Sequence, residues 1–215
     1  MPRATTQPSS PGDSLGRSPG AATIANAAMA VFSKKGFSAA SIRDIAKRAR
    51  MSPANLYHHF GSKQDLLFYL MDSSMDYLLE RSEQVMADAG EDPGARLRAL
   101  VVEHARLHAE DNIGAQISAR EIRHLEAPQR RVLVEKMRRQ QRKFDEVVDA
   151  GVAAGAFTTP FPGEAALAIA SMCTAVASWY SPKGPLRPGE VGEHYGELAL
   201  AMVMTTSPPS GRRSR

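Results

Sequence analysis

The sequence predicts an all-α protein built from nine helices. In each expected helix, apolar residues recur at the three- and four-residue spacing of an amphipathic helix, and no stretch reads as a strand. Separators rich in glycine and proline divide these segments. With 215 residues, 43% of them hydrophobic and 23% charged, the chain has an ordinary globular composition and is long enough to bury a sizeable core.

The first helix is expected to follow a tail. Residues 1–20 hold four prolines among serine, threonine and glycine, so we expect them to be disordered, like residues 207–215. The helix should span 21–35 and end at Gly36, since glycine commonly closes helices. Its apolar face carries Ile24, Ala27, Ala28, Val31 and Phe32.

Two short helices are expected next, joined by a tight turn. Ser41 can cap the first of them, with Asp44 completing a capping box. After the turn Arg50–Met51, Ser52 can cap the second helix, which spans Pro53–His58 and begins at a proline whose missing N–H costs nothing there. A helix this short, polar outside and braced by its neighbour, suits insertion into a DNA major groove. The helix that follows Ser41 has a narrow apolar stripe, which consists of Ile42, Ile45, Ala46 and Ala49.

Positive charge is concentrated in this part of the chain. Residues 21–63 carry seven lysines and arginines against one acid, a net charge of +6, whereas the rest of the chain sums to −2. A cationic module is the expected footprint of a polyanion-binding protein. A solvated helical surface would give the same run of charges, but its coincidence with the helix–turn–helix pattern favours a nucleic-acid partner.

Six further helices complete the prediction. The separators between them include Pro93–Gly94, Pro128, Gly155, Pro160–Gly163 and Ser181–Pro185. The expected spans are 62–86, 94–110, 113–126, 128–154, 162–180 and 188–205.

The pattern S-I-x-D-I-A-x-x-A-x-x-S-x-x-x-L-Y-H-H-F-x-S-K-x-x-L-L closely resembles the DNA-binding domain of TetR-type transcriptional regulators. The match extends back through Ala28–Phe32 and Gly36–Phe37 and covers roughly the first third of the chain. The resemblance implies a helix–turn–helix DNA-binding domain at 21–66. It also implies a C-terminal ligand-binding and dimerisation domain at 67–206, in which the last two helices pair across a two-fold axis.

The resemblance implies which residues meet DNA. Hydroxyls and the Lys63 ammonium would contact phosphate oxygens, because a cation in the first turn of a helix is otherwise opposed by the helix dipole. Asn55 can pair with adenine, and Pro53 can touch a thymine methyl. Tyr57 could instead lie in the core of the small domain, where Phe60 is expected to pack. The full set of candidates is Ser41, Arg43, Arg50, Ser52, Pro53, Ala54, Asn55, Tyr57, His58 and Lys63.

Arg50 departs from the family pattern, which usually has glycine in this turn. A side chain at this position has to tolerate an uncommon backbone conformation such as a positive φ. Either the turn differs slightly, or Arg50 offsets the strain by meeting a phosphate; the sequence does not decide between these.

The C-terminal half carries a weaker resemblance. The segments Trp179–Leu186 and Gln140–Phe144 resemble actinobacterial TetR-type repressors that sense acyl-CoA or steroid-degradation thioesters. That likeness implies an apolar pocket, with a cation such as Arg120 for the phosphates of CoA. An ordinary helical core would have the same spacing of apolar residues. The pocket candidates are Arg120, Met137, Phe144, Met172, Val176, Trp179 and Tyr180.

Several classes of protein are disfavoured. Cys173 is the single cysteine, so no intrachain disulfide can form, and we expect a small buried residue there. No leader or membrane-length apolar run is visible, so we expect a cytoplasmic protein that does not enter membranes. His104 and His108 have metal-ligand spacing without a second ligand pair, so helix-surface histidines are expected rather than a metal site or cofactor.

The sequence therefore predicts a homodimeric repressor that binds a palindromic operator in double-stranded DNA and is released by an apolar small molecule, for which an acyl-CoA thioester is one candidate. The first alternative is a DNA-binding regulator without a small-molecule effector. The second is a helical enzyme, which is disfavoured because we find no nucleophile–base–orienter set and no phosphate loop.

Overall fold

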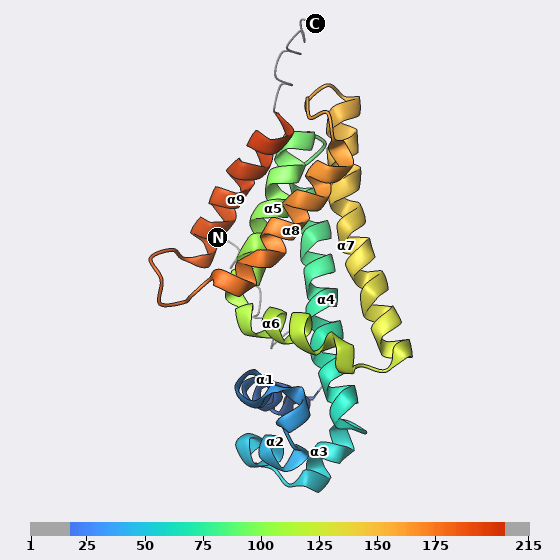
Figure 1. Cartoon of the computed structure of the whole chain (residues 1–215), viewed down its shortest axis with the longest axis vertical. Coiled ribbons are helices and arrows are strands. Elements are labelled where there is room, and N and C mark those ends of the chain that lie inside the picture. The colour runs from blue at the N-terminus through green and yellow to red at the C-terminus, as the bar shows by residue number, and fades with distance from the viewer. Residues whose placement is uncertain (1–17, 205–215) are drawn as a thin grey trace, which may run out of the picture. The chain divides into compact units, whose positions relative to one another are not determined.

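The computed structural model describes residues 18–204, which form nine α-helices and one short 3₁₀ segment (Figure 1). No strand occurs within those residues, so the all-α prediction and its nine helices are confirmed there. The predicted tails at 1–20 and 207–215 lie almost wholly outside the described range. The elements are α1 (Pro19–Ala39), α2 (Ile42–Ala49), α3 (Pro53–His59), α4 (Lys63–Asp88), α5 (Pro93–Glu110), α6 (Asn112–Glu121), η1 (Ile122–His124), α7 (Ala127–Ala153), α8 (Pro162–Trp179) and α9 (Pro188–Val203).

These elements group into two compact units that do not follow the order of the sequence. The first unit runs to Tyr77 and also includes Ile113–Leu133, and the second contains Leu78–Asn112 and the chain from Val134 onward. Helices α4 and α7 therefore each contribute residues to both units.

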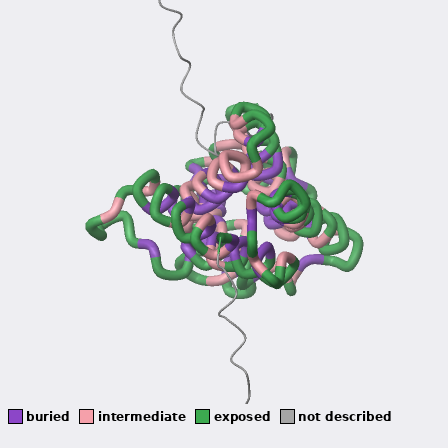
Figure 2. The backbone as a smooth tube through the Cα atoms, turned by 90° about the horizontal axis from the view of Figure 1, so that it is seen from above, coloured by how far each residue is buried: buried purple, intermediate pink, exposed green. Residues whose placement is uncertain are grey.

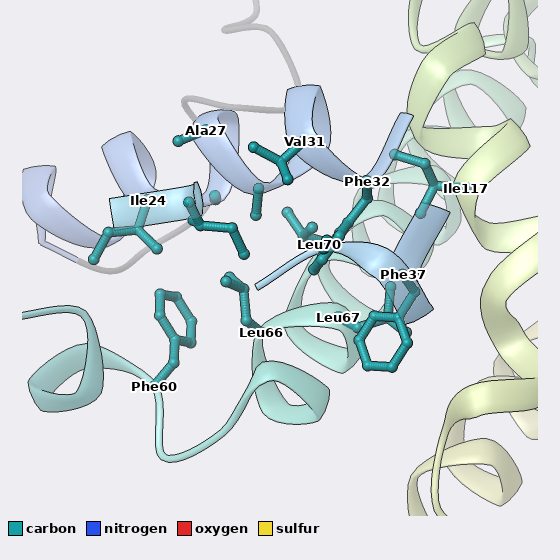
Figure 3. Packing of buried hydrophobic residues seen from close by; sticks show 14 of the residues in the cluster. Ile24, Ala27, Val31, Phe32, Phe37, Phe60, Leu66, Leu67, Leu70 and Ile117 are labelled. Carbon is teal, nitrogen blue, oxygen red and sulfur yellow. The ribbon is translucent and has the colours of Figure 1, made fainter. Parts of the chain in front are cut away.

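The core of the first unit joins α1–α3 to segments that are distant in the sequence. Phe32 and Phe37 pack together, with ring centroids 5.5 Å apart, and Leu66 and Leu67 of α4 are fully buried in the same cluster (Figure 3). Ile117 of α6 lies in this cluster too, together with Leu125 and Leu133 (Figure 3 labels Ile117). The small three-helix head thus draws part of its hydrophobic core from residues 113–133.

Helix α1 is interrupted at the predicted residue but does not end there. Gly36 adopts φ 74° and ψ 161°, which interrupts the helix where the sequence predicts a stop. A further helical turn follows and buries Phe37. At its other end α1 begins at Pro19, two residues before the predicted start at Ala21.

The second unit packs α5 against α8 and α9. Buried and exposed residues occur side by side along the helices of the chain (Figure 2). Two glycines of α9 permit a close approach: a Cβ on Gly192 would lie 2.6 Å from the carbonyl oxygen of Val102, and one on Gly196 would lie 2.9 Å from its side chain. Cys173 is fully buried here, as predicted, and burial raises the pKa of its thiol to about 12.

Two details of the sequence prediction are wrong. A single helix over 113–126 is not observed, because α6 ends at Glu121 and the chain continues as the 3₁₀ segment η1. His104 is not on the surface: 3% of it is exposed, and the α5 face that carries it is buried in the second unit.

Candidate nucleic-acid interface

The start of α2 is fixed by a reciprocal capping box. Ser41 Oγ accepts a hydrogen bond from the Asp44 amide at 3.1 Å, and the Asp44 carboxylate accepts one from the Ser41 amide at 3.0 Å. The predicted cap is therefore confirmed. Lys35 donates to the same carboxylate at 2.8 Å, and this hydrogen bond, followed by those from Ser41, lowers the pKa of Asp44 to about 2. The one acid of the cationic segment therefore stays ionised and paired.

The turn between α2 and α3 has the backbone conformation that its sequence suggests. Arg50 has φ 56° and ψ 41°, and among residues 18–204 it is the one non-glycine residue with positive φ. Its amide still donates to the carbonyls of Ala46 and Lys47, so α2 ends in a hydrogen-bonded cap. The unusual conformation is thus tolerated, and the Arg50 residue is exposed beside α3.

The third helix is short and is held by one buried anchor. Ser52 Oγ accepts from the Asn55 amide at 3.1 Å, and Pro53 occupies the first helical position, so both predicted start signals are confirmed. Leu56 is fully buried, whereas Tyr57 is 53% exposed. Phe60 is buried as predicted, so Phe60 rather than Tyr57 packs the small core.

Nine of the predicted DNA-contacting residues lie exposed in the first unit. They come from the start of α2, the turn and α3, which are consecutive segments of one helix–turn–helix. These nine are Ser41, Arg43, Arg50, Ser52, Pro53, Ala54, Asn55, Tyr57 and His58.

Lys63 differs from the rest of the set because its ammonium is already engaged. The sequence assigns this group to a phosphate oxygen. In the structure Nζ donates to the carbonyl oxygens of Phe37 and Ala40, each at 2.8 Å, and lies 4.3 Å from the centroid of the Phe37 ring.

Sequence reasoning missed the residues that meet Phe37 from the distant segment. The Phe37 amide donates to Oε1 of Glu121 at 3.3 Å, across 84 positions of sequence, and the His124 ring lies 5.4 Å from the Phe37 ring. Gln64 donates to the carbonyl of His124 at 2.8 Å. No local pattern marks such contacts, because helical periodicity shows which face is buried but not what covers it.

The predicted pocket residues are not all brought together. Phe144 and Val176 are fully buried and Tyr180 nearly so, which is the ordinary core that the sequence leaves as an alternative. Met137 and Trp179 are 39% and 48% exposed, and Met172 is half-buried. Arg120 is exposed on α6, in the other unit.

A buried polar cluster in the second unit was also missed. Gln140 Nε2 lies 2.9 Å from the Ser82 hydroxyl and 3.2 Å from Nδ1 of His104, and the His108 ring stacks on His104 with centroids 4.5 Å apart. Burial, and then the charge of His108, lowers the pKa of His104 well below its usual value. The cluster therefore offers neutral hydrogen-bonding groups inside an apolar core.

Two further observations concern residues 18–204 alone. No helix in that range is long and apolar enough to cross a bilayer. The same range contains no group of three or more histidine, cysteine or acidic side chains arranged to hold a metal ion.

Known proteins share the sequence pattern and the fold of this chain. Residues 24–70 match the family of bacterial regulatory proteins called the tetR family, and residues 90–203 match the tetracyclin repressor-like C-terminal domain. The HTH-type transcriptional repressor KstR2 of Mycobacterium tuberculosis is 31% identical over 180 residues, which cover 82% of this chain and 88% of KstR2.

Solved structures agree with these matches. A bacterial regulatory protein of the tetR family from Rhodococcus RHA1 superposes with a TM-score of 0.78 at 29% identity, covering 87% of this chain and 98% of that one. AibR, solved with isovaleryl coenzyme A and operator DNA, has the same fold, with a TM-score of 0.74 at 22% identity over 86% of this chain and 98% of its own. The chain belongs to the TetR family of transcriptional repressors.

Proposed function

We propose that this protein is a ligand-responsive repressor that grips double-stranded DNA through α2, the Arg50 turn and α3. One observation carries the proposal: nine candidate contact residues are exposed on consecutive elements of one capped helix–turn–helix in a segment of net charge +6. Serine and tyrosine hydroxyls and the arginines would position the head on phosphates, and Asn55 would read a base edge. We propose the functional division that the sequence predicts: residues 21–66 bind DNA, and residues 67–206 regulate that binding.

A homodimer would present two such heads to a palindromic operator. Members of the helix–turn–helix class place their recognition helices in major grooves about one helical turn apart. Large apolar side chains are exposed on α8 and α9, including Leu167 at 57% and Leu198 at 52%. Covering these side chains with a second copy would bury apolar area, which supports a dimer through the last two helices.

The proposed effector is an apolar small molecule, with an acyl-CoA thioester as the first candidate. The relative KstR2 is named a ketosteroid transcriptional regulator, and AibR shows that one chain of this fold can hold both isovaleryl coenzyme A and operator DNA. Helix α8 has no cation, so the CoA phosphates would need an arginine or lysine from another segment. An effector that binds the DNA-incompetent state more tightly would release the operator.

Selection of binding sites tests the proposal without a known operator. The wild-type protein is used to select duplexes from a random pool, and affinity is compared for a selected duplex and a scrambled one over a range of salt concentrations. We expect sequence-specific binding that weakens steeply with salt. Asn55→Ala should lose about 1–3 kcal/mol of discrimination at particular base pairs. An exposed lysine outside the candidate set, Lys47→Ala, is the matched control and should keep the base preference.

Titration of the DNA complex with isovaleryl-CoA and palmitoyl-CoA separates the alternatives. Release at micromolar thioester supports the sensor. Specific binding that neither thioester alters favours a different apolar effector or the regulator without an effector. A protein that binds no duplex, even at low salt, would refute the proposal, and turnover of a thioester would favour the enzyme.

A further inference from the structure

Gln140 lies in the buried polar cluster of the second unit, and one side of its amide is unused. The residue is 4% exposed, and its Nε2 donates to the Ser82 hydroxyl at 2.9 Å and to Nδ1 of His104 at 3.2 Å. Its carbonyl oxygen Oε1 is buried as well, but no group among residues 18–204 donates to it. Buried polar atoms are nearly always paired, because an unpaired one loses its hydrogen bonds with water and gains none. Oε1 therefore needs a donor that these residues do not supply.

The hydrogen bonds around Gln140 fix where His104 carries its proton. An amide N–H can only donate, so Nδ1 of His104 accepts and carries no proton. The proton of the neutral ring is on Nε2, which lies 3.4 Å from the Thr174 hydroxyl. That hydroxyl donates to the carbonyl of Ala170 at 3.0 Å. The N–H groups of Gln140 and His104 and the Thr174 hydroxyl are thus all directed at partners, and the group left over is an acceptor.

His108 adds a second acceptor to the cluster. Its ring stacks on that of His104, and its Nδ1 lies 3.0 Å from the carbonyl oxygen of His104. A carbonyl oxygen only accepts, so Nδ1 of His108 carries the proton and Nε2 of the neutral ring offers a lone pair. Burial lowers the pKa of both histidines, so both rings are neutral near pH 7. The cluster therefore suits a neutral group that donates a hydrogen bond.

The charged side chains that flank the two histidines on α5 are already paired. The Glu103 carboxylate accepts from Arg81 and from Arg106, in each case at 2.8 Å. Arg106 also meets the Glu110 carboxylate at 2.6 Å. An anionic group that entered the cluster would lose its hydration without finding an unpaired cation among these residues. A neutral polar group avoids that cost.

We propose that the effector is an apolar molecule with a neutral hydroxyl group, and that this hydroxyl donates a hydrogen bond to Oε1 of Gln140. The inference rests on the proposed response to an effector and specifies the chemistry of that effector. A hydroxyl brings the donor that Oε1 lacks, whereas an ether or carbonyl oxygen brings only a further acceptor. The carbon skeleton would pack on apolar side chains of the same core, such as Phe144, whose ring centroid lies 5.4 Å from that of His104.

Two isomeric probes that differ in one donor test the proposal. Octanol and heptyl methyl ether contain the same atoms, but only octanol has an O–H group. Each is titrated into the full-length wild-type protein, and the side-chain amide signals of isotope-labelled glutamine are followed by NMR. We expect octanol to bind about 5- to 20-fold more tightly than the ether, because it alone can pair with the buried acceptor. It should also shift the amide signal of Gln140, and octanoate should bind more weakly than octanol.

A pair of variants locates the preference. Gln140→Met keeps the length of the side chain but removes Oε1, so its affinities for the two isomers should agree within about twofold. Gln141→Met is the matched control, because that amide donates to Asp145 instead, and it should keep the preference for octanol. The wild-type comparison needs no variant, so it decides even if Gln140→Met does not fold.

Three results would overturn the proposal. These are equal affinities of the wild-type protein for the two isomers, binding of neither isomer, and an unchanged preference in a folded Gln140→Met protein. Failure of the proposed function looks different, because a protein that binds no duplex can still be titrated with both isomers.

Discussion

Replacing Arg50 with glycine should stabilise the protein. A side chain in the left-handed region costs about 1–2 kcal/mol, and Arg50 occupies that region at φ 56° and ψ 41°. Glycine removes this cost but adds about 0.5–1 kcal/mol of backbone freedom to the unfolded chain. The hydrogen bonds of the Arg50 amide to Ala46 and Lys47 persist, since they involve the backbone alone. The midpoints of these two ranges leave a net gain of about 0.75 kcal/mol, or about 1.5–3 °C in melting temperature for a chain of this size.

The same change should weaken DNA binding, so that stability and affinity move in opposite directions. Arg50→Gly removes an exposed cation between α2 and α3, which should lower the salt slope by about 0.9 if the guanidinium meets one phosphate. Arg50→Ala is the control: it loses the same charge but keeps the positive-φ cost. Calorimetry should give Arg50→Gly a higher melting temperature than both the wild type and Arg50→Ala. Fluorescence anisotropy should give the two variants equal slopes of log DNA affinity against log salt. A glycine variant no more stable than alanine would refute the strain argument.

Three further outcomes follow from the same kind of reasoning. Ser41→Ala removes the N-cap of α2 and should cost about 1 kcal/mol in urea unfolding; an unchanged midpoint would mean that the cap is dispensable. Gly192→Ala places a Cβ 2.6 Å from a backbone oxygen of α5 and should destabilise by about 1–3 kcal/mol, whereas Gly189→Ala, with nothing within 4 Å, should not destabilise. Because burial lowers the pKa of His104, the unfolded chain binds its proton more readily, and stability is lost as the pH falls below about 6.5. That loss should be smaller in His104→Gln, in which burial still lowers the pKa of His108, and equal pH dependence in both proteins would contradict it.

Local chemistry made much of the head predictable. The caps at Ser41 and Ser52 and the proline at position 53 are signals whose partners lie within three residues, so the sequence contains the whole interaction. Arg50 was foreseen only in part: the family resemblance indicated an uncommon backbone conformation as one of two alternatives, and its φ is 56°. Helical spacing located the nine helices for the same reason.

Contacts between segments that are distant in the sequence could not be predicted from local patterns. Lys63 stays a predicted phosphate contact, but no local pattern shows that its ammonium also donates to the carbonyls of Phe37 and Ala40, more than twenty positions earlier. His104 was predicted to be a helix-surface residue because no second pair of metal ligands was evident, and its spacing to His108 does not show which helix face is buried. Gln140, 36 positions later, supplies the hydrogen bond that makes its burial tolerable.

The composition of the first unit bears on how a repressor of this kind is controlled. Residues 113–133 lie between two segments of the second unit in sequence, yet Ile117, Leu125 and Leu133 are buried in the same cluster as α1–α3. A boundary drawn at residue 66 therefore cuts through a hydrophobic core. Glu121 of α6 accepts a hydrogen bond from the Phe37 amide, and the His124 ring of η1 lies against the Phe37 ring, so a displacement of that segment would disturb these contacts within the first unit. The chain passes between the two units at three points, after Tyr77, after Asn112 and after Leu133. Under the proposed function, an effector held by the second unit could therefore act on the DNA-binding head through 113–133 as well as through α4.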